Sequence, residues 1–190
     1  YVAVAGDWSD HYLLKADGTL WYTGDYLRYR NYLDETPTEP VKIMDNVAQL
    51  SDGIILKTDG TVWRMTPLRH EDGHASILFH YIMDDAKQVS GYAYEGGVGF
   101  AVKNDGSLWS WSSHADAALG RYVEEEGTYV APGKVMDDVA YVSGTMAIRT
   151  DGSLWSWGYN EFGAVGNGKT VDQYTPVKIM DDVVGIWCGR

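Results

Sequence analysis

The sequence predicts an all-β protein built from repeated β-propeller blades. Segments of alternating or branched apolar residues flank each copy of a recurrent Asp-Gly motif, a pattern typical of β-hairpins. No window keeps the 3.6-residue periodicity of a helix for more than one turn. A few short strands in each unit of about 45 residues is the signature of a propeller blade. The four copies of the motif are KADGTLW at 15–21, KTDGTVW at 57–63, KNDGSLW at 103–109 and RTDGSLW at 149–155.

Two further blocks recur in the same order and set the repeat boundaries. The first precedes each Asp-Gly motif, as in VAQLSD at 47–52 and VAYVSG at 139–144. The second follows it, as in PVKIMDN at 40–46 and PVKIMDD at 176–182. The repeats are therefore predicted at 1–46, 47–85, 86–138 and 139–182, with the start of a fifth at 183–190.

Each repeat predicts its strands in order. GIILKT at 53–58 and GFAVKN at 99–104 predict strands before the turn, and LWSW at 108–111 predicts one after it. A type I′ turn is expected at each Asp-Gly pair. The PVKIM segment predicts the last strand, with proline at its first position.

The composition limits the classes of function. The chain has 190 residues, 45% of them hydrophobic, which suffices for a core without disulfides. Cys188 is the single cysteine, so an internal disulfide is excluded. A net charge of −12 disfavours nucleic acid as a partner. No apolar run approaches the roughly 18 residues of a membrane span, so we expect no membrane insertion.

One tract carries a family resemblance. WGYNEFGAVG at 157–166 matches the W-G-x-N-x-x-G-x-x-G stretch of the RCC1 (regulator of chromosome condensation) repeat, and the surrounding DGSLW and TPVKIMDDV resemble its bacterial form. The resemblance implies RCC1-like blades in a ring of about seven. Residues 183–190 repeat the role of residues 1–8, so we expect the chain to be a segment of a larger propeller, or a partial ring completed by a partner chain, and to self-associate through open blade edges.

Two loop segments are the candidate binding residues. The segment 24–35 replaces the glycine-rich tract of the fourth repeat, and its aromatic and guanidinium groups are typical of interface hot spots. The acidic run in segment 112–131 is a candidate contact for a basic partner. A divergent packed loop and a solvated loop are the structural alternatives. The candidate residues are Tyr26, Arg28, Tyr29, Arg30, Tyr32, Glu124, Glu125 and Glu126.

Other motifs have structural interpretations. Tryptophan recurs directly after each turn, at Trp21, Trp63, Trp109 and Trp155, which favours packing of one blade on the next over a ligand platform. HEDGH at 70–74, near His80, lacks the helical spacing of a metal motif. SSHAD at 112–116 places its groups too close in sequence for a catalytic triad. We therefore predict no catalytic, metal or cofactor site.

These observations predict a non-catalytic protein–protein interaction module that presents variable loops from a rigid scaffold. The alternative is a carbohydrate-binding module of a bacterial surface protein, with loop tyrosines stacking on a glycan. A guanine-nucleotide exchange factor is a third hypothesis, implied by the family's eukaryotic founder. The bacterial look of the repeat favours an extracellular or cell-surface location.

Overall fold

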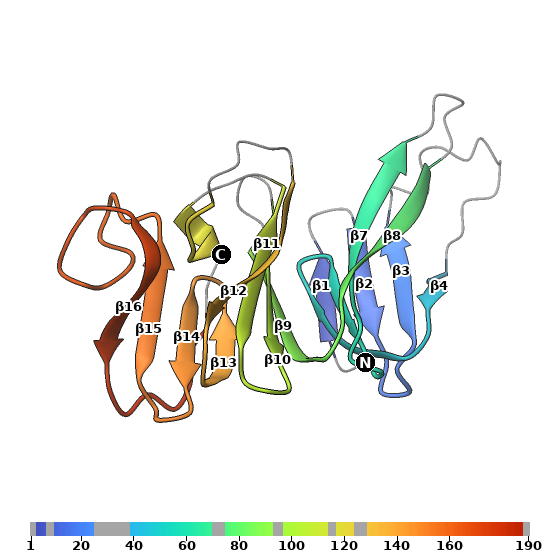
Figure 1. Ribbon diagram of the computed structural model, residues 1–190. Helices are drawn as coiled ribbons and strands as arrows, with labels where there is room; N and C mark the ends of the chain where they lie inside the picture. Colours follow the sequence, from blue (N-terminus) through green and yellow to red (C-terminus); the bar gives the residue numbers. More distant parts are fainter. Residues whose placement is uncertain are drawn as a thin grey trace. The chain divides into compact units, whose positions relative to one another are not determined.

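The computed structural model describes residues 3–6, 10–24, 39–69, 75–92, 97–113, 117–123 and 129–187. The chain divides into two compact units, Tyr1–Asp84 and Asp85–Arg190, each of which holds two blades. Every blade is a four-stranded antiparallel sheet whose strands lie side by side in sequence order (Figure 1). The predicted all-β architecture with four blades is confirmed.

The strands of the N-terminal unit form blades 1 and 2. Blade 1 contains β1 (Ala3–Gly6), β2 (Asp10–Leu14), β3 (Leu20–Gly24) and β4 (Val41–Met44). Blade 2 contains β5 (Val47–Ser51), β6 (Ile54–Lys57), β7 (Val62–Arg69) and β8 (Ala75–Met83).

The strands of the C-terminal unit form blades 3 and 4. A 3₁₀ turn, η1 (Ala117–Leu119), lies between the last two strands of blade 3. Blade 3 contains β9 (Ala86–Tyr92), β10 (Val98–Lys103), β11 (Leu108–Ser112) and β12 (Val130–Met136). Blade 4 contains β13 (Val139–Ser143), β14 (Met146–Arg149), β15 (Leu154–Gly158) and β16 (Gln173–Met180).

The Asp-Gly corners are hairpins, but the predicted type I′ turn is wrong. In the Asp-Gly pair of blade 1, Gly18 has a positive φ of 79°, and Asp17 does not. The N–H of Gly18 donates to the C=O of Lys15, and the N–H of Lys15 donates to the C=O of Thr19, both over 3.0 Å. This is a type I turn followed by a left-handed glycine. The same pair of bonds recurs in the other three blades.

Four of the five left-handed residues other than glycine in the described part of the chain lie where one blade passes to the next. Asn46, Asp85, Asp138 and Asp182 have φ between 60° and 63°. Asn and Asp adopt this conformation more readily than other non-glycine residues, which accounts for the recurrent MDD and MDN ends of the repeats. The type I′ pair lies elsewhere, at Asp52 (φ 44°) and Gly53 (φ 77°), between β5 and β6.

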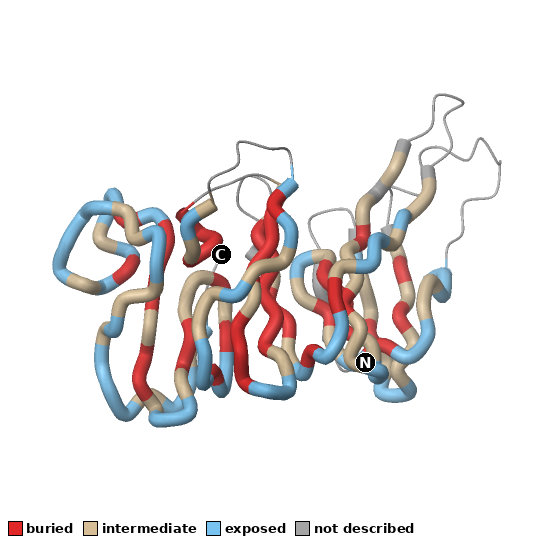
Figure 2. The backbone as a smooth tube through the Cα atoms, in the orientation of Figure 1, coloured by how far each residue is buried: buried red, intermediate tan, exposed pale blue. Residues whose placement is uncertain are grey.

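Each unit has its core between its two blades. In the C-terminal unit the core includes Phe100 and Leu108 of blade 3 and Val142 and Trp157 of blade 4, all at most 1% exposed. In the N-terminal unit Leu20 packs in one cluster with Leu50 and Ile55. Figure 2 shows the buried residues along the middle strands and the exposed residues at the turns.

The segment that follows blade 4 begins as a new blade begins. The N–H of Val183 donates to the C=O of Gly152, as that of Val47 does to Gly18 and that of Val139 does to Gly106. Residues 183–187 form no strand with the described residues, and Val184 is fully exposed. A fifth repeat from 183 stays a prediction.

Candidate functional site

None of the eight predicted binding residues can be placed. Tyr26, Arg28, Tyr29, Arg30 and Tyr32, and the run Glu124–Glu126, lie outside the described residues. So do 70–74 and 114–116, which hold most of the two rejected motifs. His80 is an exposed residue of β8. In the described part of the chain no group of histidine, cysteine or acidic side chains could hold a metal ion, and no helix is long and apolar enough to cross a membrane.

The structure does bring exposed aromatic side chains together on the C-terminal unit. Tyr122, which follows η1 in the loop between β11 and β12, stacks on Tyr174 of β16. Their ring centroids are 5.7 Å apart and the ring planes differ by 11°. Tyr122 is 74% exposed and Tyr174 43%. Two neighbouring blades therefore build one exposed aromatic surface, which we call the tyrosine pair.

The loop between β15 and β16 adds further exposed apolar groups. Tyr159, Phe162 and Val171 are 48%, 91% and 67% exposed. This loop and the loop that contains η1 lie at the same end of the C-terminal unit (Figure 1). We use the term loop end for the surface formed by these two loops and the tyrosine pair. Exposed aromatic residues on a rigid scaffold suit binding, because their contact area costs little conformational entropy.

The buried side chain of Asn160 holds the second loop in shape. Its Nδ2 donates to the C=O groups of Lys169 (2.9 Å) and Val171 (3.1 Å) and to Oδ1 of Asn167 (3.2 Å). Its Oδ1 accepts the N–H of Val165 at 3.0 Å. The N–H of Asn160 itself donates to Asp172 at 2.8 Å. One fully buried amide thus organises about a dozen loop residues, and Phe162 is held outward by an ordered backbone.

The first loop is anchored on the neighbouring blade. The indole N–H of Trp157 in blade 4 donates to the C=O of Ala118 in η1 over 2.8 Å. A Cβ atom on Gly120 would lie 2.9 Å from the same indole nitrogen, so only glycine allows this approach. Leu119 is fully buried in the core between the two blades. Tyr122 therefore projects from a loop that the hydrogen bond to Trp157 and the burial of Leu119 hold in place.

Arg121 is a structural residue although it is next to Tyr122. Its guanidinium donates to the Ser110 hydroxyl (3.1 Å) and to the C=O groups of Ser110 (3.2 Å) and Ala131 (2.6 Å). Burial lowers the pKa of this guanidinium. A Cβ atom on Gly133 would lie 2.5 Å from the guanidinium carbon, so the ion lies directly on the backbone of β12. Its hydrogen bonds stabilise the irregular pairing of β11 with β12.

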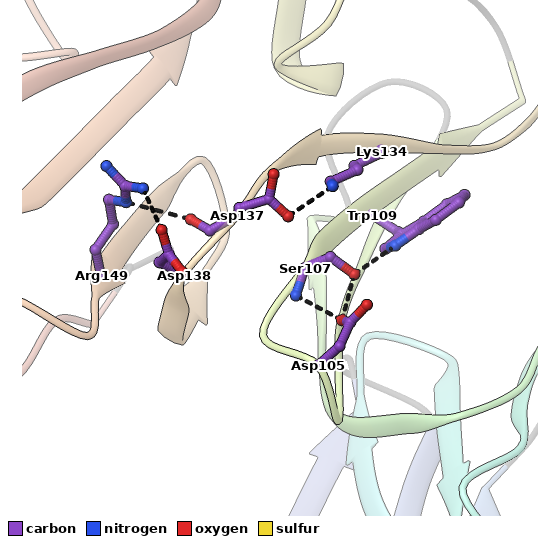
Figure 3. Close-up of polar contacts among 7 residues, drawn as sticks. All are labelled: Asp105, Ser107, Trp109, Lys134, Asp137, Asp138 and Arg149. Atoms are coloured by element: carbon purple, nitrogen blue, oxygen red, sulfur yellow. Dashed lines mark hydrogen bonds and ion pairs between the residues drawn. The ribbon is translucent and has the colours of Figure 1, made fainter.

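The opposite end of each blade carries a recurrent hydrogen-bonded clasp. Figure 3 shows it in blade 3, where Nε1 of Trp109 donates to the Ser107 hydroxyl over 2.9 Å. That hydroxyl and the Ser107 N–H both donate to Asp105, over 2.6 and 2.8 Å. The same set recurs as Asp17, Thr19 and Trp21, as Asp59, Thr61 and Trp63, and as Asp151, Ser153 and Trp155.

The clasp adds to the expected packing role of these tryptophans, since Trp63 also packs against the core cluster of the N-terminal unit. Half-buried positions are taken by Trp21, Trp63, Trp109 and Trp155, each of which bonds to its own hairpin, whereas Trp111 and Trp157 are fully buried. A cation lies over the ring in three blades: Lys15 lies 5.4 Å from the centroid of Trp21, Lys103 lies 5.1 Å from that of Trp109 and Arg149 lies 5.6 Å from that of Trp155. These rings are therefore structural groups.

The charged groups at this end of the blades interact mainly with groups of their own blade. The hydroxyl of Thr or Ser two residues later is the main cause that lowers the pKa of Asp17, Asp59, Asp105 and Asp151. Ion pairs three residues apart join Lys42 to Asp45, Lys134 to Asp137 and Lys178 to Asp181, over 2.6 to 2.7 Å. The hydrogen bond to its aspartate raises the pKa of Lys134 and of Lys178. Most acidic groups here have a partner within their own blade.

Comparison with known proteins gives a match in the fourth blade. Residues 151–190 match the model of the regulator of chromosome condensation (RCC1) repeat. No curated protein sequence matches the chain. The matched residues span most of the fourth blade, and the other three blades have the same strand order. Residues 151–190 are therefore similar to an RCC1 repeat, and the whole chain has a fold of propeller-like blades.

Solved structures share the fold of this RCC1-like chain at low sequence identity. Human WBSCR16 is 17% identical with a TM-score of 0.71, over 99% of this chain and 55% of that protein. Prp20p from Saccharomyces cerevisiae, described with its binding to Gsp1p and histones, is 19% identical with a TM-score of 0.68, over 95% and 50%. Yeast RCC1 (Prp20) bound to Kap60 is 17% identical with a TM-score of 0.68, over 95% of this chain and 48% of that protein. The chain spans about half the length of the structures it matches.

The tyrosine pair was not among the predicted site residues. The segments 112–131 and 158–175 differ in sequence and length from their counterparts, so the sequence indicated the loops but not the residues within them. Tyr174 directly precedes the TPVKIM block, and no local pattern predicts that its ring meets one from the preceding blade. That contact joins side chains of two neighbouring blades, 52 positions apart in the sequence.

Proposed function

We propose that this RCC1-like chain is a non-catalytic protein-binding module whose contact surface includes the loop end of the C-terminal unit. The tyrosine pair is the observation that carries the proposal. Two exposed rings are stacked before any partner arrives, so their side-chain order costs less on binding. The surrounding frame, held by Asn160 and Trp157, fixes where the rings lie.

The chemistry of the surface suits a protein partner. Tyrosine combines a large apolar face with a hydroxyl, and such residues are enriched at the centres of protein interfaces. The chain carries a net charge of −12, so we expect the partner surface to be basic. We keep Tyr26, Arg28, Tyr29, Arg30, Tyr32 and the run Glu124–Glu126 in the proposed contact surface on sequence grounds.

The relatives supply precedent for binding but do not name the partner. Prp20p is described as binding Gsp1p and histones, and yeast RCC1 is bound by Kap60. Because these proteins share only the fold with this chain, none of those partners is assigned to it. A guanine-nucleotide exchange activity would be seen as faster release of labelled guanine nucleotide from a small GTPase.

Carbohydrate binding is the alternative that the tyrosine pair also allows, at a bacterial cell surface. Aromatic rings stack on the apolar faces of sugars, and the hydroxyls of Tyr122 and Tyr174 would add hydrogen bonds. A glycan array, followed by titration with the fluorescence of tyrosine and tryptophan as signal, separates the two functions. Saturable binding of a glycan that is lost in Y122A/Y174A would replace the protein-binding proposal.

The proposal is tested with photo-crosslinking groups on the full chain. One version carries the group at position 174 and another at Thr150, an exposed residue of the Asp-Gly turn of blade 4. Incubation with cell extract and mass spectrometry is expected to give a defined protein from position 174 only. Affinity for that purified protein is then expected to fall about 30-fold in Y122A/Y174A, as for an interface hot spot, and to be unchanged in Y141A. Equal labelling at both positions, or full affinity in Y122A/Y174A, would contradict the proposal.

A further inference from the structure

The outer strand of blade 2 lacks two features that the other outer strands share. Each of the other three strands has a proline directly before it or within it, followed two residues later by a lysine. In blade 2 the corresponding residues are Phe79 and Tyr81: Tyr81 lies opposite Trp63 as Lys178 lies opposite Trp155. The pairs are Pro40 and Lys42 in blade 1, Pro132 and Lys134 in β12, and Pro176 and Lys178 in β16.

Proline and lysine protect a sheet edge. Proline cannot donate to a further strand, and lysine is costly to bury against one, so edge strands use both to prevent pairing with other chains. β8 is the last strand in the order β5-β6-β7-β8, and in the described part of the structure only β7 lies beside it. The nine residues Ala75–Met83 contain no proline, glycine or charged side chain. This edge is therefore unprotected.

The edge is also long and regular. β7 and β8 keep one register from Trp63 opposite Tyr81 to Arg69 opposite Ala75, whereas β12 and β16 each pair with two irregularities. The hairpin extends past the rest of the blade, because β6 pairs only with Val62–Arg64 of β7. Leu78 is 39% exposed and Tyr81 53%. A regular exposed edge is a template for another strand.

The hydrogen bonds fix which backbone groups face outward. The N–H of Met65 donates to the C=O of Gly53 over 2.8 Å, on the side of β7 away from β8. Met65 therefore exchanges no hydrogen bond with Phe79, which lies opposite, and the N–H and C=O of Phe79 point to the free edge. Because the direction of the backbone groups alternates along a strand with a period of two residues, the N–H and C=O of Ile77 and of Tyr81 also point to the free edge. Three residues thus offer a donor and an acceptor each.

We propose that a second copy of this chain pairs with this edge, β8 against β8, antiparallel, about a two-fold axis at Phe79. Strand addition of this kind uses the outward backbone groups for affinity and the alternating side chains for specificity. The symmetry places Phe79 opposite Phe79 of the second copy, Ile77 opposite its Tyr81, and Leu78 opposite its His80. Aromatic and branched cross-strand pairs of this type are favourable, and no charged residues face one another.

Two further features set the strength of the pairing. The ring of Tyr81 is already held edge-on against Trp63, with centroids 5.6 Å apart, so it loses little freedom in the dimer. The net charge of −12 on each copy opposes association. The dimer is therefore weak at low salt and strengthens as salt screens the repulsion, the opposite of a contact made by ion pairs.

Sedimentation velocity and light scattering of the full chain test the dimer over 1 to about 100 µM in 0.05 and 0.5 M NaCl. We expect a concentration-dependent dimer that is stronger at the higher salt. Y81K restores the lysine of the other blades and should weaken the dimer at least tenfold. Y141K makes the same charge change at another exposed tyrosine, 45% exposed in β13, and should leave the dimer unchanged. A monomer under all conditions, or equal effects of Y81K and Y141K, would overturn the proposal.

Disulfide crosslinking tests the register independently of affinity. In a C188S background, a cysteine at Phe79 lies opposite its own copy at a Cα separation of about 5.5 Å, within reach of a disulfide. A cysteine at Tyr81 lies about 14 Å along the strand from its copy and is out of reach. We expect mild oxidation to link F79C into dimers and to leave Y81C monomeric, with unchanged far-ultraviolet circular dichroism in both. Equal crosslinking, or none in F79C at dimer-forming concentrations, rejects this pairing.

The Y122A/Y174A variant should still dimerise, because its substitutions lie in the other unit. Failure of the dimer proposal is therefore distinguishable from failure of the proposed binding function.

Discussion

The indole N–H of Trp109 donates to the hydroxyl of Ser107 over 2.9 Å, and that hydroxyl donates in turn to a carboxylate of the same turn. The bond explains why Ser or Thr always lies two residues before the tryptophan in the repeat. A short hydroxyl side chain satisfies the indole N–H and the carboxylate together. The tryptophan is thus fixed to its own hairpin, and each blade carries its own clasp.

Removal of this hydroxyl should destabilise blade 3. In S107A the indole N–H and the Asp105 carboxylate both lose a partner, so we expect the free energy of unfolding to fall by about 1–2 kcal/mol. S107T keeps the hydroxyl that Thr19 and Thr61 supply in blades 1 and 2, and should leave stability within about 0.5 kcal/mol. Urea unfolding followed by tryptophan fluorescence measures both. Equal losses in the two variants would show that side-chain volume, and not the hydroxyl, is important at this position.

The four clasps also predict how stability depends on pH. Hydrogen bonds from Thr or Ser lower the pKa of Asp17, Asp59, Asp105 and Asp151 in the folded chain. Their stabilising contribution is therefore present above the unfolded pKa of about 3.9 and is lost as pH falls through the lower folded values. Urea midpoints measured from pH 6 to pH 3 should fall most steeply at the acid end. In D105N/D151N that acid-end slope should be shallower, and an unchanged slope would place the titration in other groups.

Much of the fold followed from the sequence because each blade repeats the same local chemistry. Four Asp-Gly corners with apolar flanks were enough to predict four sheets, and the MDD ends marked the passage between blades. The turn type was mispredicted because a side chain decided it: Asp105 accepts bonds from Ser107, and this favours a type I turn with the glycine in third place. Local pattern cannot show this competition between two turns that suit the same dipeptide.

The site was harder to predict than the fold for a related reason. The tyrosine pair joins residues 52 positions apart on two blades, so it is visible only once the two blades are placed side by side. Sequence composition directed attention to dense local clusters, such as the run Glu124–Glu126, because those are visible without a fold. The unprotected edge of β8 is an intermediate case. Alignment of the repeats shows that Phe79 and Tyr81 replace proline and lysine, but only the sheet order shows that the strand is at an edge.

The close approach of Gly99 to Trp111 gives a steric prediction. A Cβ atom at Gly99 would lie 2.2 Å from Cε2 of the fully buried indole, and φ at this position needs no glycine. G99A should therefore lower the free energy of unfolding by about 1–3 kcal/mol through overpacking alone. In a W111L background, where the ring is absent, the same substitution should cost much less. A double-mutant cycle gives the coupling, and additive effects would show that the ring is not the obstacle.

Gln88 links the first strands of blades 3 and 4. Its Nε2 donates to the C=O of Val142 over 2.9 Å, and its Oε1 accepts the N–H of the same residue at 3.1 Å. Q88A should lose about 1–3 kcal/mol of stability, because it removes both bonds from a strand that is otherwise buried at Val142. Q88E keeps the shape and the acceptor but, when ionised, cannot donate to the carbonyl. We expect Q88E to be less stable than wild type at pH 7 and to recover towards wild type as the carboxyl is protonated. Chemical unfolding at pH 7 and pH 4, each relative to wild type at the same pH, measures this, and equal losses at both would contradict it.

The last prediction connects the buried amide of Asn160 to the proposed binding surface. In N160D the new carboxylate would face the oxygens of Lys169, Val171 and Asn167, with no proton to offer them. We expect the loop between β15 and β16 to lose its order, with faster amide hydrogen exchange over 159–172 and a stability loss of about 2–4 kcal/mol. N167D is the matched control, because Oδ1 of Asn167 accepts bonds from Nδ2 of Asn160 and from the N–H of Lys169, and a carboxylate accepts them equally well. If the loop end binds the partner as proposed, N160D should weaken binding although Tyr122 and Tyr174 are intact, and N167D should not. Full affinity in N160D, with exchange in the loop clearly raised, would show that the order of this loop does not contribute to recognition.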